Sequence, residues 1–331
     1  MGNLPQVVIT DTVTGDLTPE ATILEGVAEV VALGATDEEM LVGKVEQAAA
    51  LIVYHELSIT RKTLDRLQAC KLVCRGGVGI DNVDGAYARE LGIPFTNVPD
   101  YGSEEVADSA IGMAVSLARG VHLSNARGLV DIGPWSYERA GIAFRFRGTT
   151  FGIVGLGRIG TAAAIRAKAF GFDVAFYDPY KPDGYDKALG LRRIETLEEL
   201  LAQSRIVSLH CPLTEETQHL IDAQSLAVMQ PGSYLVNTAR GAVVDTSILP
   251  DALEAGQLAG AGIDVLPQEP PADDDPLLLA WRDPEHAANH RLILNPHTAF
   301  YCEEGLGEMR TKSATACRRA ILGQPLRNLV N

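Results

Sequence analysis

The stretch that most constrains this chain is 151–178, where an apolar run leads directly into three glycines. Gly155, Gly157 and Gly160 have G-x-G-x-x-G spacing, and a second apolar run ends in Asp178, 18 residues beyond the third glycine. This order predicts a strand, a tight turn, a helix and a second strand of a doubly wound sheet. The first glycine permits the turn, the second lets a phosphate approach the backbone, and the third allows the helix to pack on the strand.

A helix that starts at such a loop directs free N–H groups at a bound phosphate, which indicates a dinucleotide site. The alternative is a glycine-rich strand–helix turn without a ligand, and the strand, helix and acid together argue against it. Asp178 would accept hydrogen bonds from ribose hydroxyls, and its charge would repel a 2′-phosphate. The loop therefore favours NAD over NADP.

Composition limits the classes of partner. The chain has 331 residues, enough for about two domains, and its net charge of -15 argues against nucleic acid. No apolar run approaches the roughly 20 residues that span a bilayer, and the first residues do not resemble a signal peptide. The five cysteines are odd in number and scattered, which favours free thiols. We expect a cytoplasmic protein with no membrane or nucleic-acid partner and no metal site.

Strand-like and helix-like runs alternate on both sides of the glycine loop, which is typical of parallel βα sheets. The expected strands are 7–10, 28–33, 51–55, 72–75 and 94–98 before the loop, and 151–154, 174–177, 206–210, 234–237, 262–265 and 292–294 from it onward. The expected helices include 37–48, 61–68, 103–120 and 303–322, with further helices starting near Thr196 and Thr246. An irregular arm is expected over 126–147.

The glycine loop lies in mid-chain, after a set of strands and helices that is complete by itself. We therefore expect an α/β protein of two Rossmann-like or flavodoxin-like domains with parallel sheets. A substrate domain of residues 1–100 plus 300–331 would hold an inserted NAD-binding domain of residues 101–299, with the substrate bound in a cleft between the domains.

Three chemistry-bearing residues, Arg240, Glu269 and His297, follow expected strands of the second domain. Ligands of such sheets bind beyond the carboxyl ends of the strands, so all three could face one crevice. Each alone has an ordinary explanation, as a surface charge, a solvated loop acid or a structural histidine. Their joint placement beside a nicotinamide site predicts instead that they position a substrate and transfer a proton.

The sequence resembles the D-isomer-specific 2-hydroxyacid dehydrogenases from about residue 7 to residue 328. The glycine loop carries this resemblance together with 75–82, 105–108, 210–214, 237–241, 264–270 and 295–297. Within the family, the branch of the C-terminal-binding proteins is the most similar, through 54–55, 166–180, 299–301 and 308–310.

The resemblance implies that His297 is the acid/base for the C2-hydroxyl proton and that Glu269 hydrogen-bonds its imidazole. Arg240 would grip the substrate carboxylate, which suits its planar fork. The implied substrate contacts are Arg240, the backbone of Gly77, Val78 and Gly79, and the side chains of Tyr54, His55 and Phe300. The implied cofactor contacts are Val106, Gly155, Gly157, Arg158, Ile159, Gly160, Asp178, Pro212, Thr217, Thr238, Ala239, Arg240, Asp264 and His297.

Two features depart from the family pattern. Glu269 and His297 are 28 positions apart, more than the family leads us to expect, because of an extra segment within 271–291 that could cap the cleft or extend a dimer contact. Phe300 stands where the C-terminal-binding proteins carry Trp, and it should narrow the substrate pocket.

The expected function is interconversion of a small D-2-hydroxy acid and its 2-keto acid with NAD. The family also implies a homodimer formed through 103–150, where we expect Met113, Val115, Leu117 and Trp135 to be exposed. Two alternatives stay open: an NADH-sensing scaffold like the C-terminal-binding proteins, and a dehydrogenase of a non-carbon acid such as phosphite.

Overall fold

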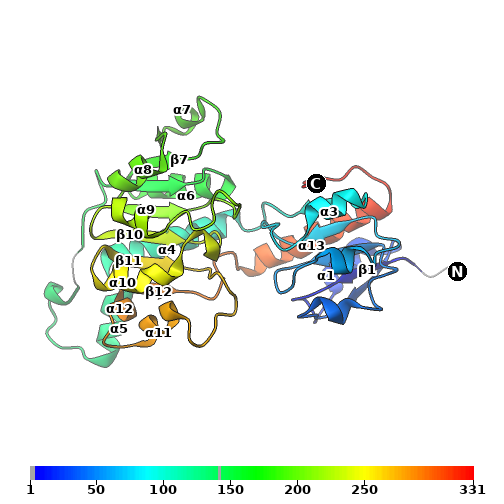
Figure 1. Ribbon diagram of the computed structural model, residues 1–331, viewed down its shortest axis with the longest axis horizontal. Helices are drawn as coiled ribbons and strands as arrows, with labels where there is room; N and C mark the ends of the chain where they lie inside the picture. Colours follow the sequence, from blue (N-terminus) through cyan, green and yellow to red (C-terminus); the bar gives the residue numbers. More distant parts are fainter. Residues whose placement is uncertain (1–3, 141–142) are drawn as a thin grey trace. The chain divides into compact units, whose positions relative to one another are not determined.

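The computed structural model describes residues 4–140 and 143–331, which divide into two compact units (Figure 1). Unit 1 comprises Met1–Gly102 and Tyr301–Asn331, and unit 2 comprises Ser103–Phe300. The chain thus leaves unit 1 once and returns to it, with crossings at 102–103 and 300–301 where the sequence suggested 100–101 and 299–300. Both units are α/β with parallel strands, which confirms the predicted fold class.

Unit 1 is built on a five-stranded parallel sheet of order β2-β1-β3-β4-β5. Its strands are β1 Gln6–Ile9, β2 Glu29–Ala32, β3 Ala50–Val53, β4 Val73–Arg75 and β5 Phe95–Asn97. Its helices are α1 Thr18–Leu24, the 3-10 turn η1 Glu38–Leu41, α2 Arg61–Leu64, α3 Gly85–Glu90 and α13 Glu303–Ile321. This strand order is that of flavodoxin-like folds.

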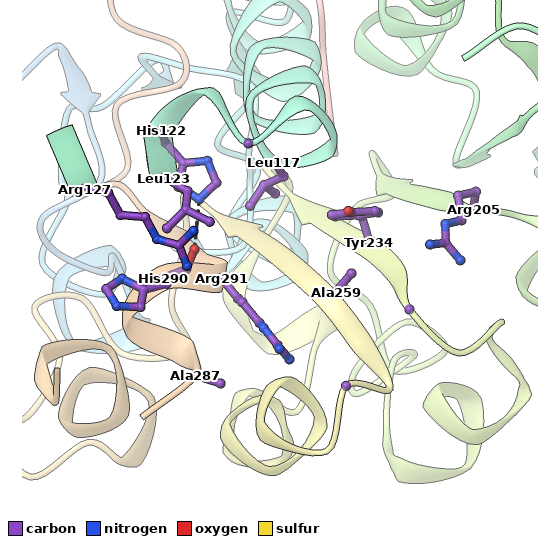
Figure 2. A pocket seen from close by; sticks show the side chains of 13 residues that line it. Leu117, His122, Leu123, Arg127, Arg205, Tyr234, Ala259, Ala287, His290 and Arg291 are labelled. Atoms are coloured by element: carbon purple, nitrogen blue, oxygen red, sulfur yellow. Dashed lines mark hydrogen bonds between the residues drawn. The ribbon is translucent and has the colours of Figure 1, made fainter. Parts of the chain in front are cut away.

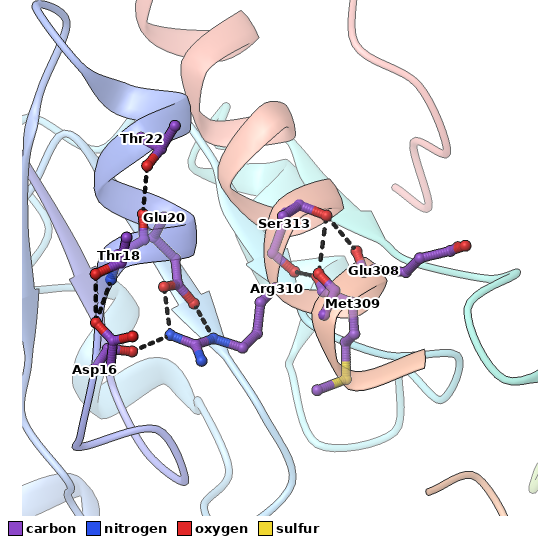
Figure 3. Close-up of polar contacts among 10 residues, drawn as sticks. Asp16, Thr18, Glu20, Thr22, Glu308, Met309, Arg310 and Ser313 are labelled. Atoms are coloured by element: carbon purple, nitrogen blue, oxygen red, sulfur yellow. Dashed lines mark hydrogen bonds and ion pairs between the residues drawn. The ribbon is translucent and has the colours of Figure 1, made fainter. Parts of the chain in front are cut away.

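An ion pair fastens the C-terminal helix α13 to α1 within unit 1, where α13 also packs on β3 and β4 (Figure 3). Glu20 of α1 is fully buried, and both its carboxylate oxygens accept hydrogen bonds of 2.6 Å from the guanidinium of Arg310. A buried carboxylate requires such a partner, because burial without one is costly. The two ends of the chain are therefore joined in one core.

Unit 2 is built on a seven-stranded parallel sheet of order β12-β11-β10-β9-β6-β7-β8. Its strands are β6 Thr150–Val154, β7 Asp173–Tyr177, β8 Arg192–Arg193, β9 Ile206–Leu209, β10 Ser233–Asn237, β11 Leu258–Ile263 and β12 Leu292–Leu294. The order reverses between the neighbours β6 and β9, and ligands of doubly wound sheets bind at that carboxyl edge. The two-residue strand β8 was missed, because Arg192-Arg193 has no apolar pattern.

Helices cover both faces of this sheet. Those of unit 2 are α4 Ser103–Arg119, α5 Val121–Val130, η2 Tyr137–Ala140, α6 Arg158–Ala169, α7 Tyr185–Leu189, α8 Leu197–Gln203, α9 Ala223–Val228, η3 Gly241–Val243, η4 Thr246–Ile248, α10 Leu249–Glu254, α11 Pro276–Arg282 and α12 Ala288–Arg291. α4 and α6 pack together over one core, and α8 to α12 cover a second core. The extra segment forms α11 and α12, which pack against α10.

Several expected elements are wrong. The helix expected over 37–48 is only the short turn η1, and two residues beyond it the backbone of Gly43 turns at a φ of +79°. The arm expected over 126–147 is helical as far as Val130, where α5 ends. Met113 and Leu117 were expected to be exposed, yet each is only 5% exposed, because this face of α4 packs on the sheet. Trp135 is exposed as expected.

Candidate functional site

The glycine loop of unit 2 has the backbone geometry that its spacing predicted. Gly155 turns the chain at a φ of +86°, and a Cβ there would lie 2.8 Å from the backbone nitrogen of Cys211. A Cβ on Gly160 would lie 2.0 Å from the carbonyl oxygen of Gly155, so this helix position also needs glycine. A Cβ on Gly157 would meet nothing within 4 Å. The second glycine therefore borders open space at the start of α6.

That open space fits a pyrophosphate. Helix α6 begins at Arg158, and no side chain caps its N-terminal N–H groups. The N-terminus of a helix carries partial positive charge, which attracts phosphate. Gly157 and Arg158 are exposed, Ile159 is half-buried and Gly160 is buried. The loop is thus open where a ligand phosphate would bind and closed where the helix meets the sheet.

Asp178 follows β7 and lies against the glycine loop. Its Oδ2 accepts a hydrogen bond of 2.8 Å from the N–H of Leu156, and its Oδ1 accepts one of 3.0 Å from the N–H of Tyr180. The Nζ of Lys181 lies 4.0 Å from Oδ2. The acid inferred from spacing is therefore held beside the turn that would cradle the phosphates.

Polar groups at the neighbouring strand ends supply further features of a ligand site. Thr238 follows β10, and its buried hydroxyl has no hydrogen-bond partner among the described residues. Buried polar groups are nearly always paired, so this hydroxyl fits a site completed by a ligand. Beyond β9, the hydroxyl of Thr217 donates 2.6 Å to the carbonyl of Pro212 and fixes that loop. These features and the glycine loop fit a bound dinucleotide.

The next strands bring Glu269 and His297 into direct contact. The Nδ1–H of His297 donates a hydrogen bond of 2.6 Å to Oε2 of Glu269. The other oxygen of this carboxylate, Oε1, accepts a hydrogen bond of 2.8 Å from the N–H of Leu266. Both side chains remain partly accessible, with 26% of His297 and 35% of Glu269 exposed. A carboxylate that fixes Nδ1–H leaves Nε2 as the nitrogen that can exchange a proton with a substrate.

The backbone around His297 is held by Asp264, at the end of β11. The N–H of His297 donates a hydrogen bond of 2.7 Å to the carbonyl of Asp264. The Asp264 carboxylate accepts hydrogen bonds from the backbone N–H groups of Thr298, at 3.0 Å, and Ala299, at 3.1 Å. Burial raises the pKa of this carboxyl, while the two N–H groups act in the opposite direction. His297 has a φ of +53°, which is uncommon for histidine and needs such support.

A third contact restrains the same segment from α4. The hydroxyl of Ser109 donates 3.1 Å to the carbonyl of Ala299. The ring of Phe300 lies 5.9 Å from the imidazole of His297, nearly perpendicular to it at 86°. Val106, one turn earlier on α4, is buried. Nothing in the sequence pattern singled out Ser109, because a helix serine is ordinarily solvent-facing or bonded to its own helix.

Arg240 lies in the loop after β10. In the sheet, β10 lies between β7, which precedes Asp178, and β11, which precedes Glu269. A Cβ on Gly241 would lie 1.9 Å from the carbonyl carbon of Leu266, so the loops after β10 and β11 meet backbone to backbone. Asn237 holds this turn, because its side chain donates to the carbonyl of Arg240 and accepts from the N–H of Ala239. The structure thus brings the segments of all three predicted catalytic residues to one edge of the sheet.

The substrate residues expected in unit 1 show two differences from the prediction. Tyr54 is only 1% exposed, and its ring packs so close that a Cβ on Gly76 would lie 2.6 Å from it, so Tyr54 supports this loop and does not line a surface. The N–H of Gly77 already donates 2.9 Å to the carbonyl of Arg75. Val78 is exposed, Gly79 is half-buried, and His55, two residues beyond the end of β3, is exposed.

A cavity of about 490 Å³ lies elsewhere in unit 2 (Figure 2). Its lining includes His122 and Arg127 of α5, Tyr234 and Ala259 near the first residues of β10 and β11, and Arg291 of the extra segment. It therefore opens at the amino edge of the sheet, opposite the edge of His297. Nε2 of His122 lies 3.1 Å from the carbonyl of His290, which links α5 to the extra segment.

Features of two other classes of site are absent from the residues that the structure describes. Across 4–140 and 143–331, no three His, Cys, Asp or Glu side chains group in a way that could hold a metal ion. In the same part of the chain, no helix combines the length and apolarity needed to cross a membrane.

The chain is similar to known proteins. The family model described as "D-isomer specific 2-hydroxyacid dehydrogenase, NAD binding domain" matches residues 111–299. The D-3-phosphoglycerate dehydrogenase of Methanocaldococcus jannaschii is 35% identical over 93% of this chain and 56% of its own length. C-terminal-binding protein 1 of Caenorhabditis elegans is 34% identical over 93% of this chain and 42% of its own length. The chain thus spans about half the length of these curated relatives.

A solved structure matches nearly end to end. The D-lactate dehydrogenase of Aquifex aeolicus, solved in complex with NAD and lactic acid, has a TM-score of 0.83 and 29% sequence identity, and the match covers 96% of each chain.

Proposed function

The chain belongs to the D-isomer-specific 2-hydroxyacid dehydrogenase family, whose NAD-binding domain it carries over residues 111–299, and we propose that it interconverts a small D-2-hydroxy acid and the corresponding 2-keto acid. The observation that carries this proposal is the 2.6 Å contact between His297 and Glu269 at the carboxyl edge of the dinucleotide-binding sheet. A histidine oriented by a carboxylate at that edge is suited to proton transfer next to a nicotinamide.

In this proposal the bound nicotinamide supplies hydride exchange with C2 of the acid. His297 takes the C2-hydroxyl proton on Nε2 during oxidation and returns it during reduction. Glu269 keeps the proton on Nδ1 and stabilises the positive imidazolium ring. Arg240 binds the substrate carboxylate through its planar guanidinium, which matches the carboxylate better than an ammonium group does.

The position of Phe300 favours a small substrate. Its ring stands 5.9 Å from the imidazole and perpendicular to it, so it occupies volume next to the proton-transfer group. We propose glyoxylate, hydroxypyruvate or pyruvate as the class of keto acid. The prediction that Gly77, Val78, Gly79 and His55 of unit 1 contribute to the substrate site stays a prediction.

The test is a panel of keto acids with NADH, followed by loss of absorbance at 340 nm. The panel holds glyoxylate, hydroxypyruvate, pyruvate, and branched and aromatic keto acids. We expect turnover with at least one small member, and a product of D configuration wherever that product is chiral, as it is from pyruvate and hydroxypyruvate. Absence of turnover on every member, by protein that binds NADH, would overturn the proposed reaction.

We also propose a cytoplasmic homodimer. Apolar side chains gather on the surface of the segment that follows α4, and the most exposed are Leu129, Val130, Ile132, Trp135 and Tyr137. An exposed apolar patch of this kind is typical of a protein contact. Cys70, Cys74, Cys211 and Cys317 are free thiols, which suits a reducing compartment.

A further inference from the structure

Lys181 lies beside the acid that would bind the adenosine ribose. Its Nζ is 4.0 Å from Oδ2 of Asp178, with 23% of the lysine side chain and 11% of the aspartate side chain exposed. Lysine side chains ordinarily extend into water. This one is held back, and its Nζ also lies 5.2 Å from the centre of the Tyr185 ring.

The segment that carries Lys181 is anchored on both sides. Tyr180 donates its N–H to Asp178 at 3.0 Å, and its hydroxyl donates to the carboxylate of Glu216 in the loop after β9. The carbonyl of Lys181 accepts 3.0 Å from the guanidinium of Arg193. The ammonium group is therefore presented from a fixed backbone at a fixed place.

Arg193, another nearby cation, is paired with different carboxylates. Arg193 lies 3.7 Å from a carboxylate oxygen of Asp183 and 3.6 Å from one of Glu195. Among the described ion pairs, the one that involves Asp178 is with Lys181. The carboxylate of Asp178, which should repel a 2′-phosphate, is thus paired with the positive charge of Lys181.

We propose that Lys181 is a second determinant of cofactor selectivity, which weakens the rejection of NADP by Asp178 and becomes a ligand of the 2′-phosphate when that carboxylate is removed. The proposal rests on the dinucleotide site of the proposed function. An aspartate at this position excludes a 2′-phosphate by repulsion, and a nearby Arg or Lys accommodates it. Here Asp178 and Lys181 are both present, and the pairing between them sets the relative affinity for NAD and NADP.

The experiment measures the dissociation constants of NADH and NADPH by fluorescence titration at low salt, without substrate. Four proteins are compared: the wild type, Asp178→Ser, Lys181→Met and the double variant. Asp178→Ser should tighten NADPH binding about tenfold, and the double variant should lose most of that gain. Lys181→Met alone should weaken NADPH about threefold and affect NADH less.

Lys187→Met is the matched control, because it removes one exposed positive charge from α7. It should leave the ratio of the two affinities as in the wild type, and thermal melting should show that every variant folds. Equal NADPH affinity of Asp178→Ser and the double variant would overturn the role of Lys181. Failure of folded wild type to bind either dinucleotide would overturn the proposed function with it, whereas NADH binding without any effect of Lys181 would leave that function standing.

Discussion

The Nδ1 of His297 and the Oε2 of Glu269 lie 2.6 Å apart, although the two residues are 28 positions apart in the chain. The segment between them forms α11, α12 and β12, so the extra residues are folded away as helices and the contact is kept. The carboxylate also accepts the N–H of Leu266. The backbone N–H of Leu266 thus fixes the position of Glu269, and Glu269 in turn orients the imidazole.

Glu269→Gln should lower kcat by about 10- to 100-fold, because an amide can still accept the Nδ1–H but does not stabilise the imidazolium. Steady-state kinetics with the best keto acid measures this change, and KM should change less than kcat. Glu285→Gln removes an exposed acid of the extra segment and is the control. Wild-type kcat in Glu269→Gln would show that this carboxylate does not assist proton transfer.

Arg310→Ala should cost about 3–5 kcal/mol in the free energy of unfolding, because it leaves Glu20 buried without its partner. Urea denaturation of the purified protein measures the loss. Arg327→Ala, at an exposed position, should be nearly neutral. The double variant Glu20→Leu/Arg310→Leu should recover stability relative to Arg310→Ala, and an equally large loss in the double variant would contradict this account.

His210 should make unfolding pH-dependent. Burial lowers its pKa to about 4, so the unfolded chain binds a proton near pH 6.5 that the folded chain binds only near pH 4. Acid therefore favours unfolding, and stability should fall by about 3 kcal/mol between pH 7 and pH 4 through this residue. Denaturation at several pH values measures the slope. His210→Asn should reduce the slope, and an unchanged slope would assign the effect to other groups.

The strands and the glycine loop could be predicted because their signals are local. A buried parallel strand is a short apolar run, and the turn needs glycine for reasons that the structure shows at Gly155 and Gly160. The contact of Glu269 with His297 was implied by family resemblance and is present in the structure. Spacing alone could place these residues at one sheet edge but could not pair them.

What the sequence did not show depends on packing between distant segments. Met113 and Leu117 read as an apolar face of a helix, and only the packed sheet shows that the face is covered. Tyr54 directly follows β3, yet its ring is buried in the core. The contacts of Ser109 with Ala299 and of Lys181 with Asp178 involve ordinary surface residue types, whose role appears only when their partners are placed.

Trp135→Ser should shift the protein from dimer towards monomer, because the proposed contact loses its largest exposed aromatic side chain. Sedimentation velocity over a range of concentrations measures the change. Tyr301→Ser, another exposed aromatic position but outside 103–150, is the control. A wild type that is monomeric at every concentration would contradict the proposed homodimer.

The most direct test of the central claim is a comparison of wild type and His297→Ala with the best keto acid. The measurement is the rate of NADH oxidation, alongside fluorescence titration of NADH on the same samples. The account predicts that wild type turns over and that His297→Ala loses about 10³-fold or more in kcat while it still binds NADH. Wild-type turnover by the folded His297→Ala variant would contradict the assignment of His297 as the acid/base.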